Sequence, residues 1–308
     1  MDTLSILISI IAAIGLFTHS LESFSNNLKE HANDKMQLAI KRFTDSKFKG
    51  LLTGFVGTGI IQSSSAVVAI TVSFVDSGII SFHNSLPILL GSNLGTTITA
   101  WLVSFKIEAL GITFLALGFI LGYFKGKLAL ISKPIFYLGL ILFSLDMIGH
   151  FLEPIKNSEE LIHYLSYAAK PIIGVLLGAL VTAICQSSSV TIGLTIILCS
   201  QQLLGLDSAI AIIVGSNIGT TSTAFIAAMK LDKTAKQTAL ANLIFNIIGV
   251  LIYLPLAVPY KNLIDSFNVG IAFEVALAHL VFNLIITILI LPFTKQFGKL
   301  IQNRLMKS

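Results

Sequence analysis

The sequence predicts an all-α, multi-pass membrane protein that contains two repeats of inverted topology. Its 308 residues are 55% hydrophobic and only 11% charged, and their mean hydropathy is +0.89. This composition is too apolar for a water-soluble domain and is typical of a chain with many membrane-spanning helices. In addition, one polar motif occurs twice, 124 residues apart, within apolar segments. Matching polar interruptions are typical of a duplicated membrane fold with one ligand site between its halves.

Nine apolar segments give the expected membrane elements in order. They lie at residues 4–24, 51–80, 85–105, 107–124, 134–152, 172–204, 208–229, 238–258 and 271–293. A helix needs about 20 residues to cross the hydrocarbon layer. The segments 51–80 and 172–204 are too long for one crossing and short for two, so each is expected to form a re-entrant helical hairpin with its polar residues near the tip. No basic region precedes segment 4–24, which is therefore expected to be a retained helix and not a signal peptide.

Basic residues set the expected topology. They gather in four clusters, which the positive-inside rule assigns to the cytoplasm. The clusters are Lys29, Lys35, Lys41, Arg42, Lys47 and Lys49; Lys125, Lys127 and Lys133; Lys230, Lys233 and Lys236; and Lys295, Lys299, Arg304 and Lys307. Because an even number of crossings must separate two clusters on one side, segments 51–80 and 172–204 are expected to return to the side from which they enter. Segment 134–152 crosses between them, so the two hairpins enter from opposite sides and the repeats are inverted.

The expected organisation follows from these elements. Residues 1–127 form a first repeat, 128–258 a second, inverted repeat, and 259–308 an extra transmembrane helix with a basic cytoplasmic tail. Each repeat consists of a helix, a re-entrant hairpin, a broken helix and a further helix. Residues Glu153 to Lys170 are expected to form an exposed connection. The net charge of +5 arises from short basic segments between apolar runs, so binding to nucleic acid is not expected.

The duplicated motif carries the polar chemistry of the chain. The first copy is Gln62-Ser63-Ser64-Ser65 followed by Gly91-Ser92-Asn93-Leu94-Gly95-Thr96-Thr97, and the second is Gln186-Ser187-Ser188-Ser189 followed by Gly215-Ser216-Asn217-Ile218-Gly219-Thr220-Thr221. The glycines are expected to let the backbone leave the helix, so that free carbonyl and N–H groups face a ligand. Hydroxyl and N–H groups at helix N-termini suit an oxyanion, whereas hydroxyl, amide and carbonyl oxygens suit sodium. No Lys or Arg lies within either copy, so cations bound together with an anion would offset its charge.

Other interpretations of the motif have different consequences. Ser, Thr and Gly are also the ordinary residues of close helix packing in membranes, but packing alone does not explain their recurrence at identical offsets. An intramembrane serine hydrolase with His279 as its base would need a Gly-x-Ser-x-Gly elbow, which the sequence lacks, and no catalytic residues are expected. A passive anion channel remains a third interpretation.

The motif resembles that of the type II sodium-dependent phosphate cotransporters and their bacterial relatives. Further matching segments are Leu16-Phe17, Gly139-Leu140-Ile141-Leu142-Phe143, Asn242-Leu243-Ile244-Phe245-Asn246 and Ala278-His279-Leu280-Val281-Phe282-Asn283. The resemblance implies symport of inorganic phosphate with sodium by alternating access across the cell (inner) membrane. Sodium would be a co-substrate, with no other cofactor or metal. Another oxyanion and coupling to protons remain alternatives, and the C-terminal regulatory domain of many family members is expected to be absent.

The resemblance and the motif together define the expected site. The expected phosphate-binding residues are Ser63, Ser64, Ser65, Asn93, Ser187, Ser188, Ser189 and Asn217. The expected sodium-binding residues are Gln62, Thr96, Thr97, Gln186, Thr220 and Thr221. Two pairs at i and i+4, Asn242 with Asn246 and His279 with Asn283, are expected either to hold the hairpin tips or simply to join helices by hydrogen bonds. Expected partners are phosphate, sodium and the lipid bilayer, and a homodimer is left open.

Overall fold

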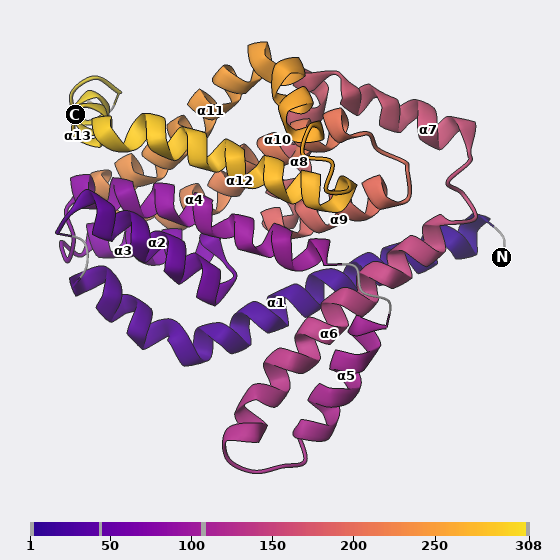
Figure 1. Cartoon of the computed structure of the whole chain (residues 1–308). Helices are drawn as coiled ribbons and strands as arrows, with labels where there is room; N and C mark the ends of the chain where they lie inside the picture. Colours follow the sequence, from indigo (N-terminus) through magenta and orange to yellow (C-terminus); the bar gives the residue numbers. More distant parts are fainter. Residues whose placement is uncertain (1–2, 43–44, 106–108, 306–308) are drawn as a thin grey trace.

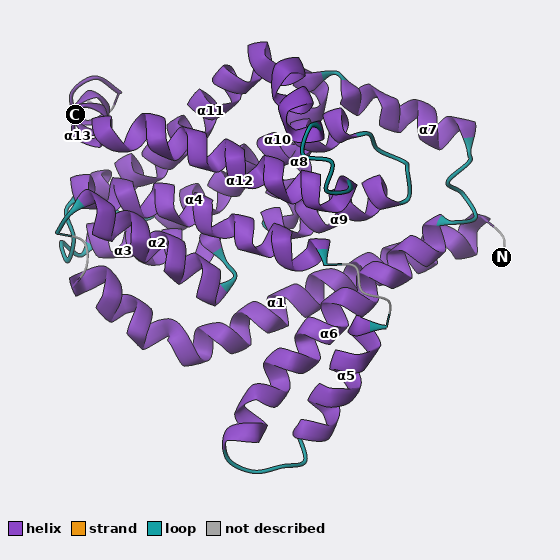
Figure 2. Cartoon of the chain, in the orientation of Figure 1, coloured by secondary structure: helices purple, strands orange, loops and turns teal. Residues whose placement is uncertain are grey.

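The computed structural model describes residues 3–42, 45–105 and 109–305, which form helices joined by turns and loops without any strand (Figures 1 and 2). Five helices lie among the described residues of the first half of the chain, meaning the part before residue 127. They are α1 Thr3–Arg42, α2 Lys47–Ile61, α3 Ser64–Asp76, α4 Phe82–Ser104 and α5 Leu110–Leu121. Only Gln62 and Ser63 join α2 to α3, so these two helices form a tight hairpin.

The second half of the chain repeats this order. Its helices are α6 Lys127–Leu152, α7 Glu159–Ser166, the 3₁₀ turn η1 Tyr167–Ala169, α8 Pro171–Cys185, α9 Ser188–Ser200, α10 Leu206–Ala228 and α11 Lys233–Asp265. The bounds of α8, α9 and α10 are those of α2, α3 and α4 shifted by 124 residues. The duplication in the sequence therefore extends to the helices. The helix α7 has no buried residue, as expected for the exposed connection Glu153 to Lys170, whereas Ala168 in η1 is buried.

The last part of the chain begins with α12 Ile271–Ile290, which packs against α4 and α10. Short elements follow it: η2 Leu291–Phe293, α13 Thr294–Leu300 and the π-helical turn η3 Ile301–Leu305. Figure 1 shows α12 (yellow) lying across the body of the molecule, while α5 and part of α6 project from it as a separate helical pair. The two ends of the chain lie on opposite sides of this view.

Six helices among the described residues are long and apolar enough to cross a membrane, or seven if the bent pair Glu159–Ala169 and Pro171–Cys185 counts as one span. The six are Leu4–Glu30, Phe82–Ser104, Leu128–Leu152, Leu206–Ala228, Lys233–Asp265 and Ile271–Asn303. The helix α5 has 12 residues, or about 18 Å of length, whereas the hydrocarbon layer is about 30 Å thick. Within the segment expected at 107–124 as a crossing, the described helix is therefore shorter than one span, and Tyr123 and Phe124 lie in the turn before α6. Residues 106–108 lie outside the described part of the chain.

The expected break in the helices α4 and α10 is wrong, because both run without interruption through the Gly-Ser-Asn motif. The glycines serve close packing instead. A Cβ on Gly91 would lie 2.0 Å from the carbonyl oxygen of Leu51, and one on Gly215 would lie 2.0 Å from that of Val175. The backbones of α2 and α4, and of α8 and α10, are thus in direct contact, which a residue without a side chain permits.

Candidate functional site

Both Gln-Ser-Ser-Ser segments line one cavity of about 340 Å³. One segment forms the turn between α2 and α3 and the other the turn between α8 and α9. The lining residues are Thr18, Leu21, Glu22, Ser25, Asn26, Gln62, Ser63, Ser64, Ser65, Cys185, Gln186, Ser187, Ser188, Ser189 and Val190. A water molecule needs only about 10–15 Å³ of such space. The cavity therefore has room for a polyatomic ion together with smaller ions or water.

The same local geometry builds each turn. Gln62 and Gln186 have φ values of 56° and 53°, in the left-handed region, and this conformation ends α2 and α8. Ser63 and Ser187 are the N-caps of the helices that follow. Their Oγ atoms accept hydrogen bonds from the backbone N–H groups of Ala66 at 3.2 Å and Val190 at 3.4 Å. A capping serine at this position satisfies one of the helix's N–H groups and fixes where the helix begins.

Two helix N-termini consequently open on the cavity. The first N–H groups of an α-helix have no partner within the helix, and the helix dipole places about half a positive charge at this end. The serine hydroxyls add further donors: since the Oγ atoms of Ser63 and Ser187 accept from the backbone, their own protons remain available for a ligand. These turns therefore present hydrogen-bond donors, an arrangement that suits an oxyanion.

The two glutamines of the motif differ in their contacts. The side chain of Gln62 donates to the carbonyl oxygen of Gly59 and accepts a 2.9 Å hydrogen bond from Thr99. Gln186 is exposed. Thr223, the counterpart of Thr99 in the second half, donates to the carbonyl oxygen of Thr220 at 2.7 Å, and its Oγ atom also lies within hydrogen-bond distance of the Oγ atom of Ser65, at 3.2 Å. The contact with Ser65 joins a helix of the second half to the turn of the first half.

The two motif asparagines contact α11 and α12. The Nδ2 group of Asn93 donates to Asn246 at 3.1 Å, and the oxygen of Asn217 lies 3.4 Å from the imidazole of His279. Both asparagines lie outside the lining of the cavity. One member of each i, i+4 pair, Asn246 or His279, thus holds one motif asparagine in place. Within α11, Asn246 also donates to the carbonyl oxygen of Asn242, and within α12, Asn283 donates to that of His279.

The four motif threonines lie away from the cavity. Thr96 and Thr220 donate to the carbonyl oxygens of Ser92 and Ser216, four residues earlier. Thr97 and Thr221 donate to carbonyl oxygens three residues earlier in the same helix. All four are buried, and none lines the cavity. Such bonds to the preceding turn satisfy a hydroxyl locally, so the structure does not bring these threonines together with the serine turns.

The helix α1 supplies a wall that the motif did not predict. Thr18, Glu22, Ser25 and Asn26 line the cavity from this helix. They occupy positions i, i+4, i+7 and i+8, which form one face of a helix. A polar stripe with this period inside the apolar span Leu4–Glu30 was a signal in the sequence that could have identified them.

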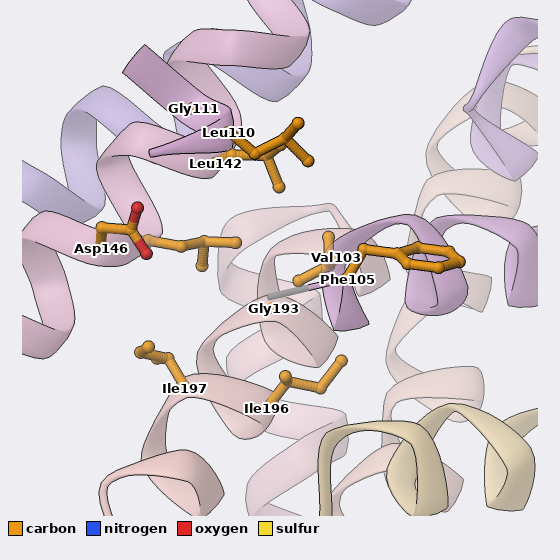
Figure 3. Close-up of a pocket in the computed structure, with 10 residues that line it drawn as sticks. Val103, Phe105, Leu110, Gly111, Leu142, Asp146, Gly193, Ile196 and Ile197 are labelled. Carbon is orange, nitrogen blue, oxygen red and sulfur yellow. The ribbon is translucent and has the colours of Figure 1, made fainter. Parts of the chain in front are cut away.

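A second, smaller cavity has a different character (Figure 3). Its volume is about 20 Å³, enough for about one water molecule. Asp146 on α6 is the one charged residue of its lining, and its other lining residues are apolar side chains or glycine, including Ile196 and Ile197 of α9. This space is too small and too apolar to bind a polyatomic ion.

These features define a multi-pass helical membrane protein with a polar cavity between two related halves. The Na+/Pi-cotransporter family matches residues 16–150 and 156–278, so the chain belongs to this family, which is a family of transporters and not of enzymes. No solved structure matches the chain.

Several relatives align over most or part of the chain. The Bacillus subtilis protein YqeW is 33% identical over 85% of this chain and 86% of its own length. The "Putative inorganic phosphate export protein YjbB" of Salmonella typhimurium is 24% identical over 85% of this chain, which spans about half (49%) of that relative. The human "Sodium-dependent phosphate transport protein 2B" is 33% identical over 46% of this chain and 21% of its own length.

Proposed function

We propose that this protein carries inorganic phosphate across the cell membrane together with sodium, by alternating access. The observation that carries the proposal is the cavity in which the two Gln-Ser-Ser-Ser turns meet. It combines two helix N-termini, serine hydroxyl donors and amide oxygens, which are the groups that a tetrahedral oxyanion and small cations require. Family membership and the names of the relatives YjbB and 2B support phosphate as the substrate.

The proposed roles follow the positions of the residues. Ser63, Ser64 and Ser65 with Ser187, Ser188 and Ser189 bind phosphate, because they line the cavity at the two helix N-termini. Gln62 and Gln186 contribute oxygens to sodium. Asn93 and Asn217 hold α4 and α10 against α11 and α12, through Asn246 and His279. Thr96, Thr97, Thr220 and Thr221 contact sodium only if their helices rearrange during transport, since their hydroxyls now bond to their own helices.

The proposed topology has two inverted repeats, 1–127 and 128–258, and a C-terminal unit, 259–308. The hairpin helices α3 and α9 have 13 residues each, about 20 Å of length, which is shorter than the hydrocarbon layer and supports re-entrant hairpins. The clusters of basic residues support a cytoplasmic C-terminus. A homodimer is compatible with this arrangement and would show in the mass of the detergent-solubilised protein.

Uptake of radiolabelled phosphate into proteoliposomes tests the function. An inward sodium gradient is expected to drive phosphate accumulation above equilibrium, and replacing sodium by choline is expected to abolish it. Because binding energies are reciprocal, phosphate is also expected to raise the affinity for sodium. Equal uptake in sodium and choline would refute sodium coupling, and a response to a proton gradient alone would assign the coupling to protons.

Competition by arsenate and sulfate in the same assay defines the range of oxyanions that the protein carries. Loading the vesicles with phosphate tests whether the protein also exports it.

A further inference from the structure

The wall that α1 contributes to the cavity differs chemically from the serine turns. The hydroxyl of Thr18 donates to the carbonyl oxygen of Ile14 at 2.9 Å, and that of Ser25 donates to the carbonyl oxygen of Ile61 at 3.1 Å. With their protons committed, these two oxygens can only accept. The hydroxyls of Ser63 and Ser187 are in the opposite situation, since they accept from the backbone and keep their protons free. The cavity thus has a wall of acceptors as well as turns of donors.

Glu22 lies in the middle of this acceptor wall. It is the one residue with a charged side chain among those that line the cavity, and none of the ion pairs within the described residues involves it. It also lies within the candidate span Leu4–Glu30. A carboxylate within a membrane-spanning helix is costly unless it faces water or a cation, and for this reason it is a functional candidate.

A cation beside Glu22 would balance the charge of the cavity when an anion is bound. A phosphate anion bound at the serine turns would be repelled by the carboxylate, because no Lys, Arg or His lines the same space to offset the two negative charges. The two helix N-termini offset only part of the negative charge. A hard monovalent cation held by the acceptor wall removes this repulsion, and carboxylate, hydroxyl and amide oxygens are the ligands that such cations prefer.

The repeat provides an independent indication that the acid matters. The residue 124 positions after Glu22 is Asp146, so both halves carry an acid at the same place in their first long helix. Asp146 lines the small cavity beside α9 (Figure 3), whereas Glu22 faces the large one. An acid at this position therefore recurs at the same offset as the serine motif, although only one of the two acids faces the serine turns in this conformation.

We propose that Glu22 binds the cation that accompanies phosphate, with Thr18, Ser25 and the amide oxygen of Asn26 as neighbouring ligands. This inference rests on the proposed function for the identity of the anion and the coupling, but the cation site itself exists without phosphate. It adds to the site a residue outside the duplicated motif. Glu22 would then link the two substrates, since phosphate binds well only after the carboxylate is neutralised.

Binding of ²²Na⁺ to the purified protein in choline buffer without phosphate tests this site directly. The wild-type protein is expected to bind sodium, and Glu22→Gln is expected to weaken that binding about 10-fold or more. Glu22→Asp should retain part of the affinity. Glu30→Gln is the matched control, because Glu30 is exposed on the same helix but does not line the cavity.

Phosphate binding to the same variants separates this inference from the proposed function. In Glu22→Gln the repelling carboxylate is absent, so the affinity for phosphate at low sodium should equal or exceed that of wild type and should rise less steeply with sodium. Sodium binding to Glu22→Gln that equals wild type, or no sodium binding to wild type without phosphate, overturns the inference even if sodium drives phosphate uptake. Sodium binding that depends on Glu22 in a protein that does not transport phosphate would instead refute the proposed function alone. If Glu22→Gln does not fold, Ser25→Ala must weaken sodium binding, and unchanged binding would overturn the inference.

Discussion

At the scale of single residues, a hydroxyl group can donate to a ligand only if its proton is not already donated to another group of the protein. Ser63 and Ser187 accept hydrogen bonds from the backbone and can still donate, whereas the motif threonines donate to their own helices. The sequence shows that these positions are duplicated but not where each proton goes, because the rotamer depends on packing against the neighbouring turn. The serine turns could therefore be predicted from the sequence, whereas the hydrogen bonds from the threonine hydroxyls to their own helices could not.

The same limit explains why the acceptor wall was missed. Glu22 and Ser25 are single polar residues at the end of a first segment that is mostly apolar and was therefore interpreted as a membrane-spanning helix. The basic residues that follow this segment indicate its topology and not a binding site. Their i, i+3 spacing was visible in the sequence, but only the folded chain shows that this face of α1 meets both serine turns. The acid at the same offset in the other half, Asp146, was the remaining signal.

Alanine substitutions test whether both turns serve one ligand. Ser64 and Ser188 line the cavity at the first position of α3 and α9, and neither is a helix cap, so alanine should not disturb the helices. Ser64→Ala and Ser188→Ala are each expected to cost about 1–3 kcal/mol of phosphate binding, or about 5- to 150-fold in affinity. The double variant should be non-additive, because neighbouring groups on one ligand are coupled.

Ser85→Ala is the control for these serine substitutions. Ser85 is fully buried and its hydroxyl donates to the carbonyl oxygen of Phe82 within the same helix. Phosphate affinity is expected to remain near wild type in this variant. If Ser64→Ala or Ser188→Ala also leaves sodium-driven uptake unchanged at limiting phosphate, that turn does not bind the substrate.

At the scale of helices, each half is organised around a closely packed pair. The helix α2 packs on α4 and α8 packs on α10, and glycines at equivalent positions make both contacts. The broken helix expected from the sequence was wrong because glycine has two common uses in membrane helices, to end them and to let them approach. The sequence showed the duplicated glycines, but their use depends on the partner backbone, which lies about 40 residues away in the chain.

Gly91→Ala tests this packing. Its new Cβ would lie 2.0 Å from the carbonyl oxygen of Leu51, so α2 and α4 would have to separate, and overpacking of this kind costs about 3 kcal/mol or more. Thermal unfolding in detergent should show a lower midpoint, and Gly215→Ala should behave alike. Gly15→Ala, at which nothing lies within 4 Å, is expected to be neutral or slightly stabilising. Equal midpoints for Gly91→Ala and Gly15→Ala would refute the close contact.

At the scale of the whole molecule, the topology can be tested with cysteines. In a variant with Cys185 and Cys199 replaced by serine, single cysteines are introduced at Asp34, Ser158 and Asn303, all of which are exposed. If the basic clusters lie in the cytoplasm, an impermeant thiol reagent applied to intact cells should label position 158 only. Labelling at 34 would overturn the inverted arrangement of the repeats, and labelling of all three after the membrane is permeabilised shows that each site can react.

The two halves share their helices and many contacts but differ around the cavity, and this asymmetry bears on mechanism. Gln62 is hydrogen-bonded where Gln186 is exposed, and Glu22 faces the large cavity where Asp146 faces the small one. In transporters with inverted repeats, the conformations of the halves exchange as the site opens to the other side. The asymmetry is thus expected to be a property of one state of the cycle and not a fixed difference between the halves.

Cys185 reports on this exchange, because it is exposed and lines the large cavity, whereas Cys199 is 3% exposed. In a Cys199→Ser variant, an impermeant thiol reagent is expected to reach Cys185 from only one side of the membrane when sodium is absent. Sodium together with phosphate should slow this reaction and raise the rate from the opposite side, because the ligands shift the population towards states in which the cavity is occupied or faces the other way. The Cys185→Ser protein measures the background. Equal reaction rates from both sides, whatever the ions, would identify a continuous pathway and hence a channel, since alternating access never opens the cavity to both sides at once.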